Sequence, residues 1–439
     1  SPEMKWTEGP TMFKRKGVYY LTYTGNQVWE KNYRVEYAYS HNLEENFTEE
    51  NDNVILLNTE GDDHVGLGHN GIVVGPDLDT YYIVYHNSYN IKYSDDKDAS
   101  FSRRINMDKI TWNGDKLCVQ GPTTHEIDNP DMPDFYDYFD NSALSNWTKR
   151  GTVSVNNGFA TLGAGSKLLS NTATADIFTA EYNMREASGT SFVTFGYVDG
   201  ANYGRAYIDK NSKEFVMQKF VNGAAQWTKT SALASGFDYT ALHSIVIKQD
   251  ADGIYGLVDG VERITHTDRV SGGKIGYFSA QNYAVECGFT AFSGKAYGSA
   301  DYETVKPVPS KIPAVQANNI KDNFTVCDAS GAELGNAVSV SKHQTLEYKI
   351  NARQSGTYTV DLKLNRMADD MTVAVTVDGK IVKSVTIPAD GNLTDGYNTY
   401  SVRGVNLSAG KQTLGVFIAN GSGELYEVNV FSDSTVSAY

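Results

Sequence analysis

A glutamate near the start of the chain has the residue type and the neighbours needed for proton-transfer chemistry. Glu8 lies in Trp6-Thr-Glu-Gly-Pro10 and is followed by the tyrosine-rich stretch Gly17-Val-Tyr-Tyr-Leu-Thr-Tyr23. A pocket beside such a stretch can hold a carboxylic acid in its protonated form, ready to donate a proton to a poor leaving group. Taken alone, Glu8 is more typical of a solvated turn, so the prediction depends on the other motifs of the chain.

A histidine in Gly66-Leu-Gly-His-Asn70 is the second candidate. The glycines beside His69 let the backbone enter a crowded position from which one imidazole projects toward water or a metal ion. One histidine does not hold a calcium-like ion by itself, so waters would complete its shell. His64 and His86 are interpreted as structural, because the first lies in an acidic loop and the second ends a buried strand.

The elements that must position these residues are predicted to be β-strands. The 439 residues allow two to four domains, each with a core of its own. With 29 tyrosines, 40 glycines and 21% charged residues, the composition favours aromatic, turn-rich strands over helices. We therefore expect an all-β protein.

Strand patterns and proline-rich segments divide the chain into three modules. Residues 1–128 contain closely spaced short strands, typical of propeller blades or a sandwich. Residues 129–297 alternate apolar and polar positions over many strands, which predicts a sandwich or jelly roll. Residues 298–312, with Lys306-Pro-Val-Pro-Ser310, read as a stiff linker, and residues 313–439 as a third β-sandwich.

The motifs of residues 1–128, in their order and spacing, resemble the later blades of the five-bladed propeller of glycoside hydrolase family 43. The resemblance implies that Glu8 is the general acid and that Arg103 lines the active site. It also implies that His69 projects into the propeller channel toward water or a calcium-like ion, with no organic cofactor. Trp29 and Tyr33 follow a blade strand, where their rings either stack on the sugar or pack within the blade. The motifs that carry the resemblance are Trp6–Pro10, Gly66–Asn70, Tyr81–His86, Arg103–Trp112 and Gly121–Thr123.

An inverting hydrolase needs a second carboxylate about 6.5–9.5 Å from the acid to activate water. The resemblance places this base aspartate in the first blade of the family and a modulating aspartate in the second, and this chain is expected to contain neither. Three alternatives account for the N-terminal blades: a separate polypeptide after cleavage, a segment outside these residues, or loss of the blades altogether, and the first two are favoured. Without them the open sheet edges would invite aggregation.

The two later modules resemble attachments of polysaccharide hydrolases. Residues 129–297 are similar to concanavalin-like jelly rolls, and residues 313–439 to carbohydrate-binding modules of families 6 and 35. That second resemblance implies sugar contacts from Asn429 and from Tyr397 or Tyr400, with a structural spacer as the alternative. Gln316-Ala-Asn318 stands where relatives carry a Glu-Ala-Glu calcium motif, which disfavours calcium there.

Charge and composition limit the classes of molecule and the environments that suit this protein. The net charge of −15 disfavours nucleic acid, and no apolar run approaches the roughly 20 residues that span a bilayer. Three widely spaced cysteines predict buried free thiols rather than a disulfide framework. The module types predict a bacterial protein that is secreted, periplasmic or on the cell surface. The expected function is an exo-acting, inverting arabinofuranosidase, xylosidase or galactanase acting on plant-type polysaccharide; the alternative is a catalytically inactive glycan-binding protein.

Overall fold

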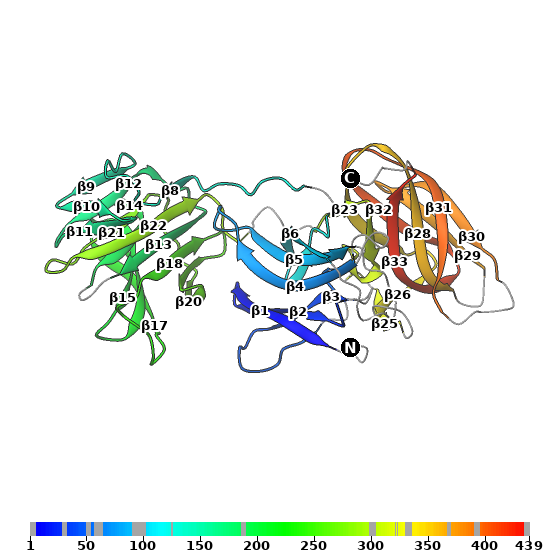
Figure 1. Ribbon diagram of the computed structural model, residues 1–439, viewed down its shortest axis with the longest axis horizontal. Coiled ribbons are helices and arrows are strands. Elements are labelled where there is room, and N and C mark those ends of the chain that lie inside the picture. Colours follow the sequence, from blue (N-terminus) through cyan, green and yellow to red (C-terminus); the bar gives the residue numbers. More distant parts are fainter. Residues whose placement is uncertain are drawn as a thin grey trace.

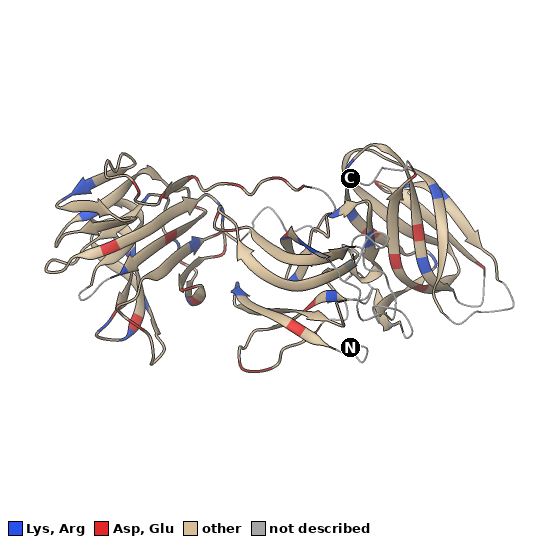
Figure 2. Ribbon diagram, in the orientation of Figure 1, with Lys and Arg blue, Asp and Glu red and all other residues tan. Residues whose placement is uncertain are grey.

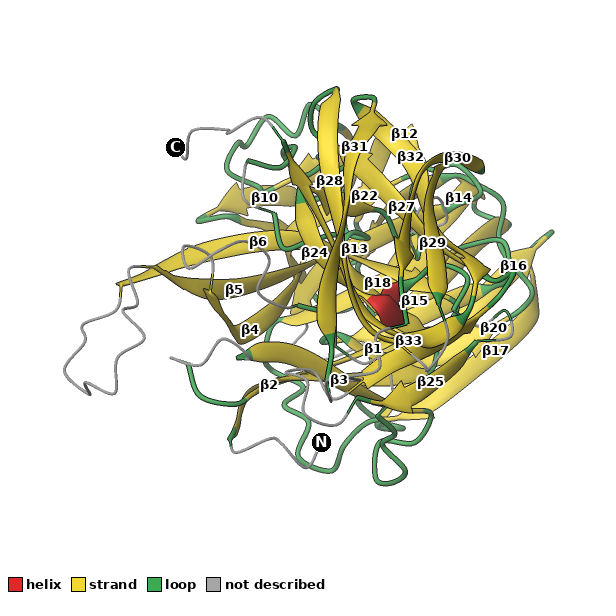
Figure 3. Ribbon diagram, turned by 90° about the vertical axis from the view of Figure 1, so that its right-hand side faces the viewer, coloured by secondary structure: helices red, strands yellow, loops and turns green. Residues whose placement is uncertain are grey.

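The described part of the chain folds into β-sheets, with one short helical turn, η1 (Ala314–Gln316) (Figure 3). The all-β prediction is confirmed. Figure 1 shows the first two sheets lying between two sandwiches. The computed structural model describes residues 6–28, 33–49, 54–56, 65–89, 102–123, 126–185, 190–297, 304–320, 322, 324–329, 336–366, 370–389 and 396–433.

The front module consists of two antiparallel sheets, ordered β1-β2-β3 and β4-β5-β6-β7. Such small meandering sheets are compatible with propeller blades, and the described residues do not close a propeller ring. The strands are β1 (Thr7–Arg15), β2 (Val18–Gly25), β3 (Arg34–Ser40), β4 (Val65–Val74), β5 (Tyr81–Tyr89), β6 (Ser102–Asn113) and β7 (Lys116–Val119).

Aromatic side chains from both sheets form the core of the front module. The ring of Phe13 stacks on Tyr20 with centroids 5.3 Å apart, and Trp112 meets Tyr20 at 6.2 Å and Tyr81 at 5.3 Å. Edge-to-face and offset contacts of this kind stabilise by about 0.5–1.5 kcal/mol beyond the buried area. The period-two alternation of β2 sends Val18 and Tyr20 into this core.

The second module is a sandwich whose two sheets enclose one core. The first sheet contains β10 (Val153–Asn156), β11 (Phe159–Leu162), β22 (Val285–Ser293), β13 (Phe178–Arg185), β18 (His243–Gln249), β19 (Ile254–Val258) and β20 (Val261–His266), with β8 (Phe135–Asp137) paired to β22. The facing sheet is ordered β17 (Ala224–Ala232), β16 (Glu214–Val221), β15 (Asn202–Asp209), β14 (Phe192–Asp199), β21 (Lys274–Phe278), β12 (Lys167–Ala173) and β9 (Trp147–Arg150).

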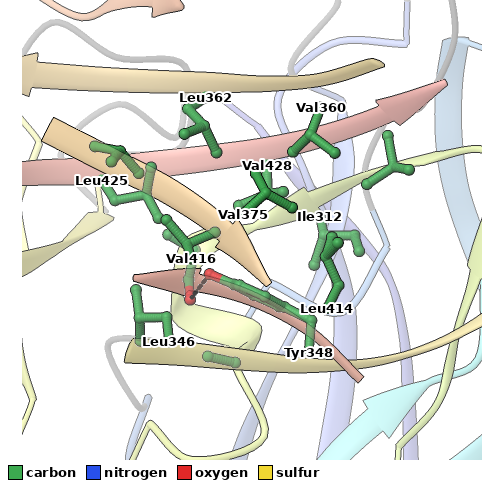
Figure 4. Close-up of a cluster of buried hydrophobic side chains, with 14 of the residues drawn as sticks. Ile312, Leu346, Tyr348, Val360, Leu362, Val375, Leu414, Val416, Leu425 and Val428 are labelled. Atoms are coloured by element: carbon green, nitrogen blue, oxygen red, sulfur yellow. Dashed lines mark hydrogen bonds between the residues drawn. The ribbon is translucent and has the colours of Figure 1, made fainter. Parts of the chain in front are cut away.

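The third module is also a sandwich, and its aliphatic core lies between the two sheets (Figure 4). The buried Tyr348 hydroxyl donates a hydrogen bond to the Ala314 carbonyl at 3.1 Å, which attaches η1 to this core. One sheet is ordered β23 (Lys306–Val308), β27 (Thr345–Ala352), β32 (Gly410–Asn420), β29 (Met371–Val377) and β30 (Lys380–Ile387). The other is ordered β25 (Thr325–Asp328), β26 (Asn336–Ser341), β33 (Ser422–Ser432), β28 (Gly356–Arg366) and β31 (Asn398–Leu407), with β24 (Ser310–Pro313) paired to β33.

The segment predicted as a linker, residues 298–312, differs from the expectation where the structure describes it. Strand β23 pairs in parallel with β27, and β24 pairs antiparallel with β33. Prolines are compatible with strands at sheet edges, where fewer ladder hydrogen bonds are needed. From residue 306 onward the segment is therefore part of the third module rather than a spacer.

Buried cations connect the front module to both sandwiches. The Arg15 guanidinium lies 4.2 Å from the ring centroid of Trp112 and donates to the carbonyl of Tyr297 in the second module. On the other side, the Lys306 ammonium donates to the Val119 carbonyl at 2.7 Å. Removing such cations from water is costly unless they are paired. These contacts therefore hold the modules in defined positions.

The cysteines and the charged residues are distributed as the sequence led us to expect. The three cysteines are thiols outside any disulfide, with Cys118 and Cys287 buried and Cys327 half-buried. Acidic and basic residues both occur in each of the three modules (Figure 2). Within the described ranges, no helix is long and apolar enough to cross a membrane.

Candidate active site

Glu8 stands where β1 is bent by a bulge. The pairing of β1 with β2 shifts register between Glu8 and Thr11. Gly9 in this bulge has a φ of +59°, and a Cβ there would lie 3.2 Å from the Cα of His69. Glycine therefore permits both the left-handed backbone and the close approach of β1 to β4. The Glu8 side chain remains 32% exposed.

The phenol of Tyr33 holds this carboxyl group. Tyr33 precedes β3, is fully buried, and donates from its hydroxyl to Glu8 Oε1 at 2.5 Å. Burial and the neighbouring Glu8 raise the pKa of Tyr33 well above its usual value, so the hydroxyl keeps its proton and acts as a donor. Sugar stacking by Tyr33, one of the two roles expected from sequence, is wrong, because a buried ring has no face for a ligand. Trp29 lies outside the described residues.

His69, on β4, lies beside Glu8 of β1. Its Nδ1 is 3.9 Å from Glu8 Oε1, and its side chain is 58% exposed. The backbone has a φ of +49°, unusual for histidine, and its N–H donates to Thr24 Oγ1 at 2.8 Å. A Cβ at the preceding Gly68 would fall 2.3 Å from Tyr33 Cε1. The glycine thus brings β4 against Tyr33 and leaves the imidazole projecting outward.

The structure adds His86, which sequence reasoning treated as structural, to this cluster. Its ring centroid lies 5.9 Å from that of Tyr33, and its Nε2 is buried without a hydrogen-bond partner. Burial, followed by the charges of Arg103 and His69, lowers the pKa of His86 to about 4. The imidazole is therefore neutral at neutral pH. The signal that could have found His86 was the expected pairing of the strand that carries His69 with the next strand along the chain, since His86 stands opposite Gly68 in the β4–β5 register.

Arg103 supplies the positive charge of the site. It stands on β6 opposite Ser88 of β5 and is exposed. Its positive charge opposes the rise that burial causes in the pKa of Tyr33 and adds to the fall that burial causes in the pKa of His86, which places the guanidinium within electrostatic reach of both side chains. Glu8 and His69 therefore lie side by side, Tyr33 and His86 join them, and Arg103 acts on this group through its charge; the catalytic roles of these residues stay predictions.

The cluster can perform proton transfer at Glu8, and its fit to a calcium-like ion is poor. Calcium takes six to eight oxygen ligands, as a rule. Among the described residues, no three His, Cys, Asp or Glu side chains gather to hold a metal ion. The Glu8 Oε1 nearest to His69 already accepts the Tyr33 hydroxyl. A metal beside His69 stays a prediction, and no step below depends on one.

Of the sugar-binding residues predicted in the third module, Tyr400 and Asn429 lie apart. Asn429 of β33 stands opposite Asp361 of β28, whereas Tyr400 packs against the hydrophobic core between the sheets. Because side chains alternate across a strand, Tyr400 and Asn429 lie on opposite faces of the sheet. The Tyr397 hydroxyl donates to Glu424 Oε2 at 2.9 Å. Tyr400 and Asn429 therefore do not contact one ligand together, and the alternative pair of Asn429 and Tyr397 stays a prediction.

Comparison with known proteins supports the assignment of the front module. Residues 1–117 match the family model described as glycosyl hydrolases family 43, so the resemblance predicted from the motifs is confirmed for this part of the chain. The Beta-D-galactofuranosidase xynD of Aspergillus niger is 34% identical over 86 residues, or 19% of this chain and 24% of that protein. The match thus spans about a quarter of the length of this curated relative.

Solved structures give weaker likenesses. The carbohydrate-binding module CBM66 from Bacillus subtilis is 19% identical, with a TM-score of 0.31, over 34% of this chain and 97% of that one. A thermostable family-43 glycoside hydrolase is 28% identical, with a TM-score of 0.26, over 29% of this chain and 39% of that one. Scores this low support no conclusion about this protein.

Proposed function

We propose that the front module supplies the general acid of an inverting, exo-acting glycoside hydrolase. The observation that carries the proposal is the hydrogen bond from Tyr33 to Glu8 Oε1, made within a cluster that also contains His69, His86 and Arg103. The family match over residues 1–117 supports it. The second carboxylate, an aspartate that activates water, is proposed to come from outside this chain, on blades that complete the propeller.

The reaction proposed for Glu8 is a single displacement. Glu8 transfers its proton to the glycosidic oxygen as the bond from that oxygen to the anomeric carbon breaks. Water attacks the anomeric carbon from the opposite side and gives its proton to the aspartate, which inverts the configuration. As Glu8 becomes a carboxylate, the Tyr33 hydroxyl already points at Oε1 and stabilises the new negative charge.

The proposed substrates are plant-type polysaccharides and their oligosaccharides. The range is that of an arabinofuranosidase, xylosidase or galactanase, and the name of the Aspergillus niger relative supports including galactofuranosides. The Arg103 guanidinium is proposed to position the sugar hydroxyls. Bacterial origin and secretion remain predictions.

Leaving-group dependence tests Glu8. The variant Glu8→Gln is expected to lose turnover on polysaccharide and alkyl glycosides, whose leaving oxygen needs a proton, and to keep much of it on dinitrophenyl glycosides, whose leaving group does not. Glu49→Gln is the matched control, because Glu49 accepts the Tyr23 hydroxyl at 2.5 Å in the same module. It is expected to behave as wild type on both substrates.

Two outcomes contradict the assignment. If Glu8→Gln loses activity equally on both substrates, Glu8 is not the proton donor. If the wild-type protein, together with any companion blades found by intact mass and electrophoresis, hydrolyses no arabinofuranoside, xyloside, galactoside or polysaccharide, the catalytically inactive glycan-binding alternative replaces the enzyme.

A further inference from the structure

The second module carries a row of stacked rings on the face turned away from its core. Along β14, Val193 enters the core while Phe192 lies on the opposite face. Phe192 stacks on Phe278 with centroids 4.9 Å apart and planes 9° apart, and on Tyr203 at 6.4 Å and 16°. Tyr203 stacks in turn on Phe220 at 4.9 Å and 11°. Because each ring covers the face of its neighbour, mainly ring edges meet the solvent.

An arginine stands beside this row. The Arg205 guanidinium lies 4.9 Å from the ring centroid of Phe220 and 5.2 Å from that of Phe192. Its Nε donates to Gln218 Oε1 at 2.6 Å, and Gln218 Nε2 donates to Thr228 Oγ1 at 3.0 Å. Three neighbouring strands, β15, β16 and β17, therefore orient one half-buried guanidinium.

The terminal nitrogens of Arg205 have no protein acceptor within the described part of the chain. The residue that holds its Nε is a neutral glutamine, so no carboxylate in contact cancels its charge. Asp209 and Glu214, whose negative charges act on the neighbouring Tyr207, stand opposite one another in the β15–β16 register, and neither forms an ion pair with Arg205 among the described residues. An arginine that is held by one nitrogen and stacked among rings is preorganised to accept a planar anion with the others.

Arg185, in the other sheet of the same sandwich, has a carboxylate partner of the kind that Arg205 lacks among the described residues. Its guanidinium also lies near a ring, 5.6 Å from the centroid of Phe159. Its Nε and one terminal nitrogen each donate to Glu286 Oε2 at 2.7 Å. Arg185 thus has both an aromatic neighbour and a carboxylate partner, whereas Arg205 has aromatic neighbours and a neutral glutamine, with no carboxylate partner among the described residues.

We infer that Arg205 and the adjoining ring row form a binding site for the carboxylate of a uronic acid residue in an acidic polysaccharide. The guanidinium receives the carboxylate through two parallel hydrogen bonds, and the ring edges pack against the apolar CH groups of the sugar. At the far end of the row, the Lys167 ammonium lies 5.6 Å from the Phe278 centroid and offers a cation to a neighbouring uronate. The choice of a polysaccharide as the carrier of the carboxylate rests on the proposed function of the front module.

Recognition at this site is local rather than long-range. The whole protein has a net charge of −15, which repels a polyanion at a distance. Binding therefore depends on direct contact with the Arg205 fork, and it is expected to weaken with added salt less steeply than binding to an extended basic surface. The charge on the sugar, and not the identity of its backbone, is what the site distinguishes.

The test compares one polymer with and without its charge. Binding of the full chain to polygalacturonate and to the same polymer after complete methyl esterification is measured by affinity electrophoresis and titration calorimetry. The Glu8→Gln background keeps hydrolysis from depleting either polymer. The expected result is binding to polygalacturonate that is at least tenfold tighter than binding to the ester.

Arg205→Gln is expected to weaken binding of polygalacturonate about tenfold or more, because charge-assisted hydrogen bonds are lost. Arg205→Lys, which keeps the charge but not the fork, is expected to weaken binding as well and serves if the glutamine variant folds poorly. Arg185→Gln removes the same charge from the opposite sheet and is expected to bind as its parent does.

Three results overturn the proposal: equal binding of acid and ester, unchanged binding by folded Arg205→Gln and Arg205→Lys, or no binding of either polygalacturonate or alginate. These results are independent of catalysis. If Glu8→Gln loses hydrolysis but still binds polygalacturonate, the result bears on the proposed role of Glu8 and leaves the site at Arg205 standing. Retained wild-type hydrolysis without such binding removes only the site at Arg205.

Discussion

Replacing Tyr33 by phenylalanine separates the catalytic use of its hydroxyl from its packing. The change removes one oxygen and leaves the buried ring in place against His86. The lost group donates to Glu8 Oε1 at 2.5 Å, and this hydrogen bond strengthens when Glu8 gives up its proton and becomes negatively charged. Because the gain comes in the transition state, the loss is expected in kcat rather than in KM.

The structure sets the size of both effects of Tyr33→Phe. A hydrogen bond to a charged group contributes about 1.5–3 kcal/mol, which corresponds to a fall in kcat of about 10- to 150-fold. Glu8 remains 32% exposed, so water can solvate the released carboxylate oxygen. The free energy of unfolding is therefore expected to fall by only about 1 kcal/mol.

The assay measures kcat and KM of Tyr33→Phe on an alkyl glycoside, with urea denaturation of the same preparation. Tyr23→Phe is the matched control, because Tyr23 also donates to a glutamate, Glu49, at 2.5 Å in the same module. It is expected to lose similar stability and no activity. Should Tyr33→Phe retain the wild-type kcat while Glu8→Gln loses it, the hydroxyl of Tyr33 has no part in proton transfer.

Two further substitutions test the packing around the site and between the modules. Gly68→Ala would place its Cβ 2.3 Å from Tyr33 Cε1, so urea denaturation should show a free energy of unfolding lower by about 1–3 kcal/mol. The displaced Tyr33 should also lower kcat. An unchanged kcat would show that catalysis tolerates displacement of Tyr33. Burial lowers the pKa of Lys306 to about 8, below the unfolded value of about 10.5, so the folded protein binds fewer protons between these values and gains stability as pH rises through them. The gain in the free energy of unfolding between pH 7.5 and pH 10 is worth about 3 kcal/mol at most, and Lys306→Met should remove it when denaturation is measured at both pH values. If the variant shows the same gain as the wild type, another group is its source.

Much of the architecture was predictable because strand formation and turn chemistry are local properties. The alternation along β2 and β14 and the glycines at the bulges are legible without coordinates. The motifs that carry Glu8, His69 and Arg103 lie on β1, β4 and β6, and it was the family resemblance of these motifs that assigned all three residues to one site. The linker prediction was wrong from residue 306 onward, since prolines do not reveal whether an edge strand has a partner.

The sequence by itself determined the strand-rich class, the front-module motifs and the identity of the proton donor as a hypothesis. Only the tertiary structure decided which side chains surround that donor. Tyr33 is remote from Glu8 along the chain, and its burial and its hydrogen bond depend on how β1 and β4 pack together. Strand register likewise places Tyr400 and Asn429 on opposite faces of their sheet, and it sets which side chains lie beside the terminal nitrogens of Arg205. Register and packing are set by contacts between distant segments, which no local pattern of residues encodes.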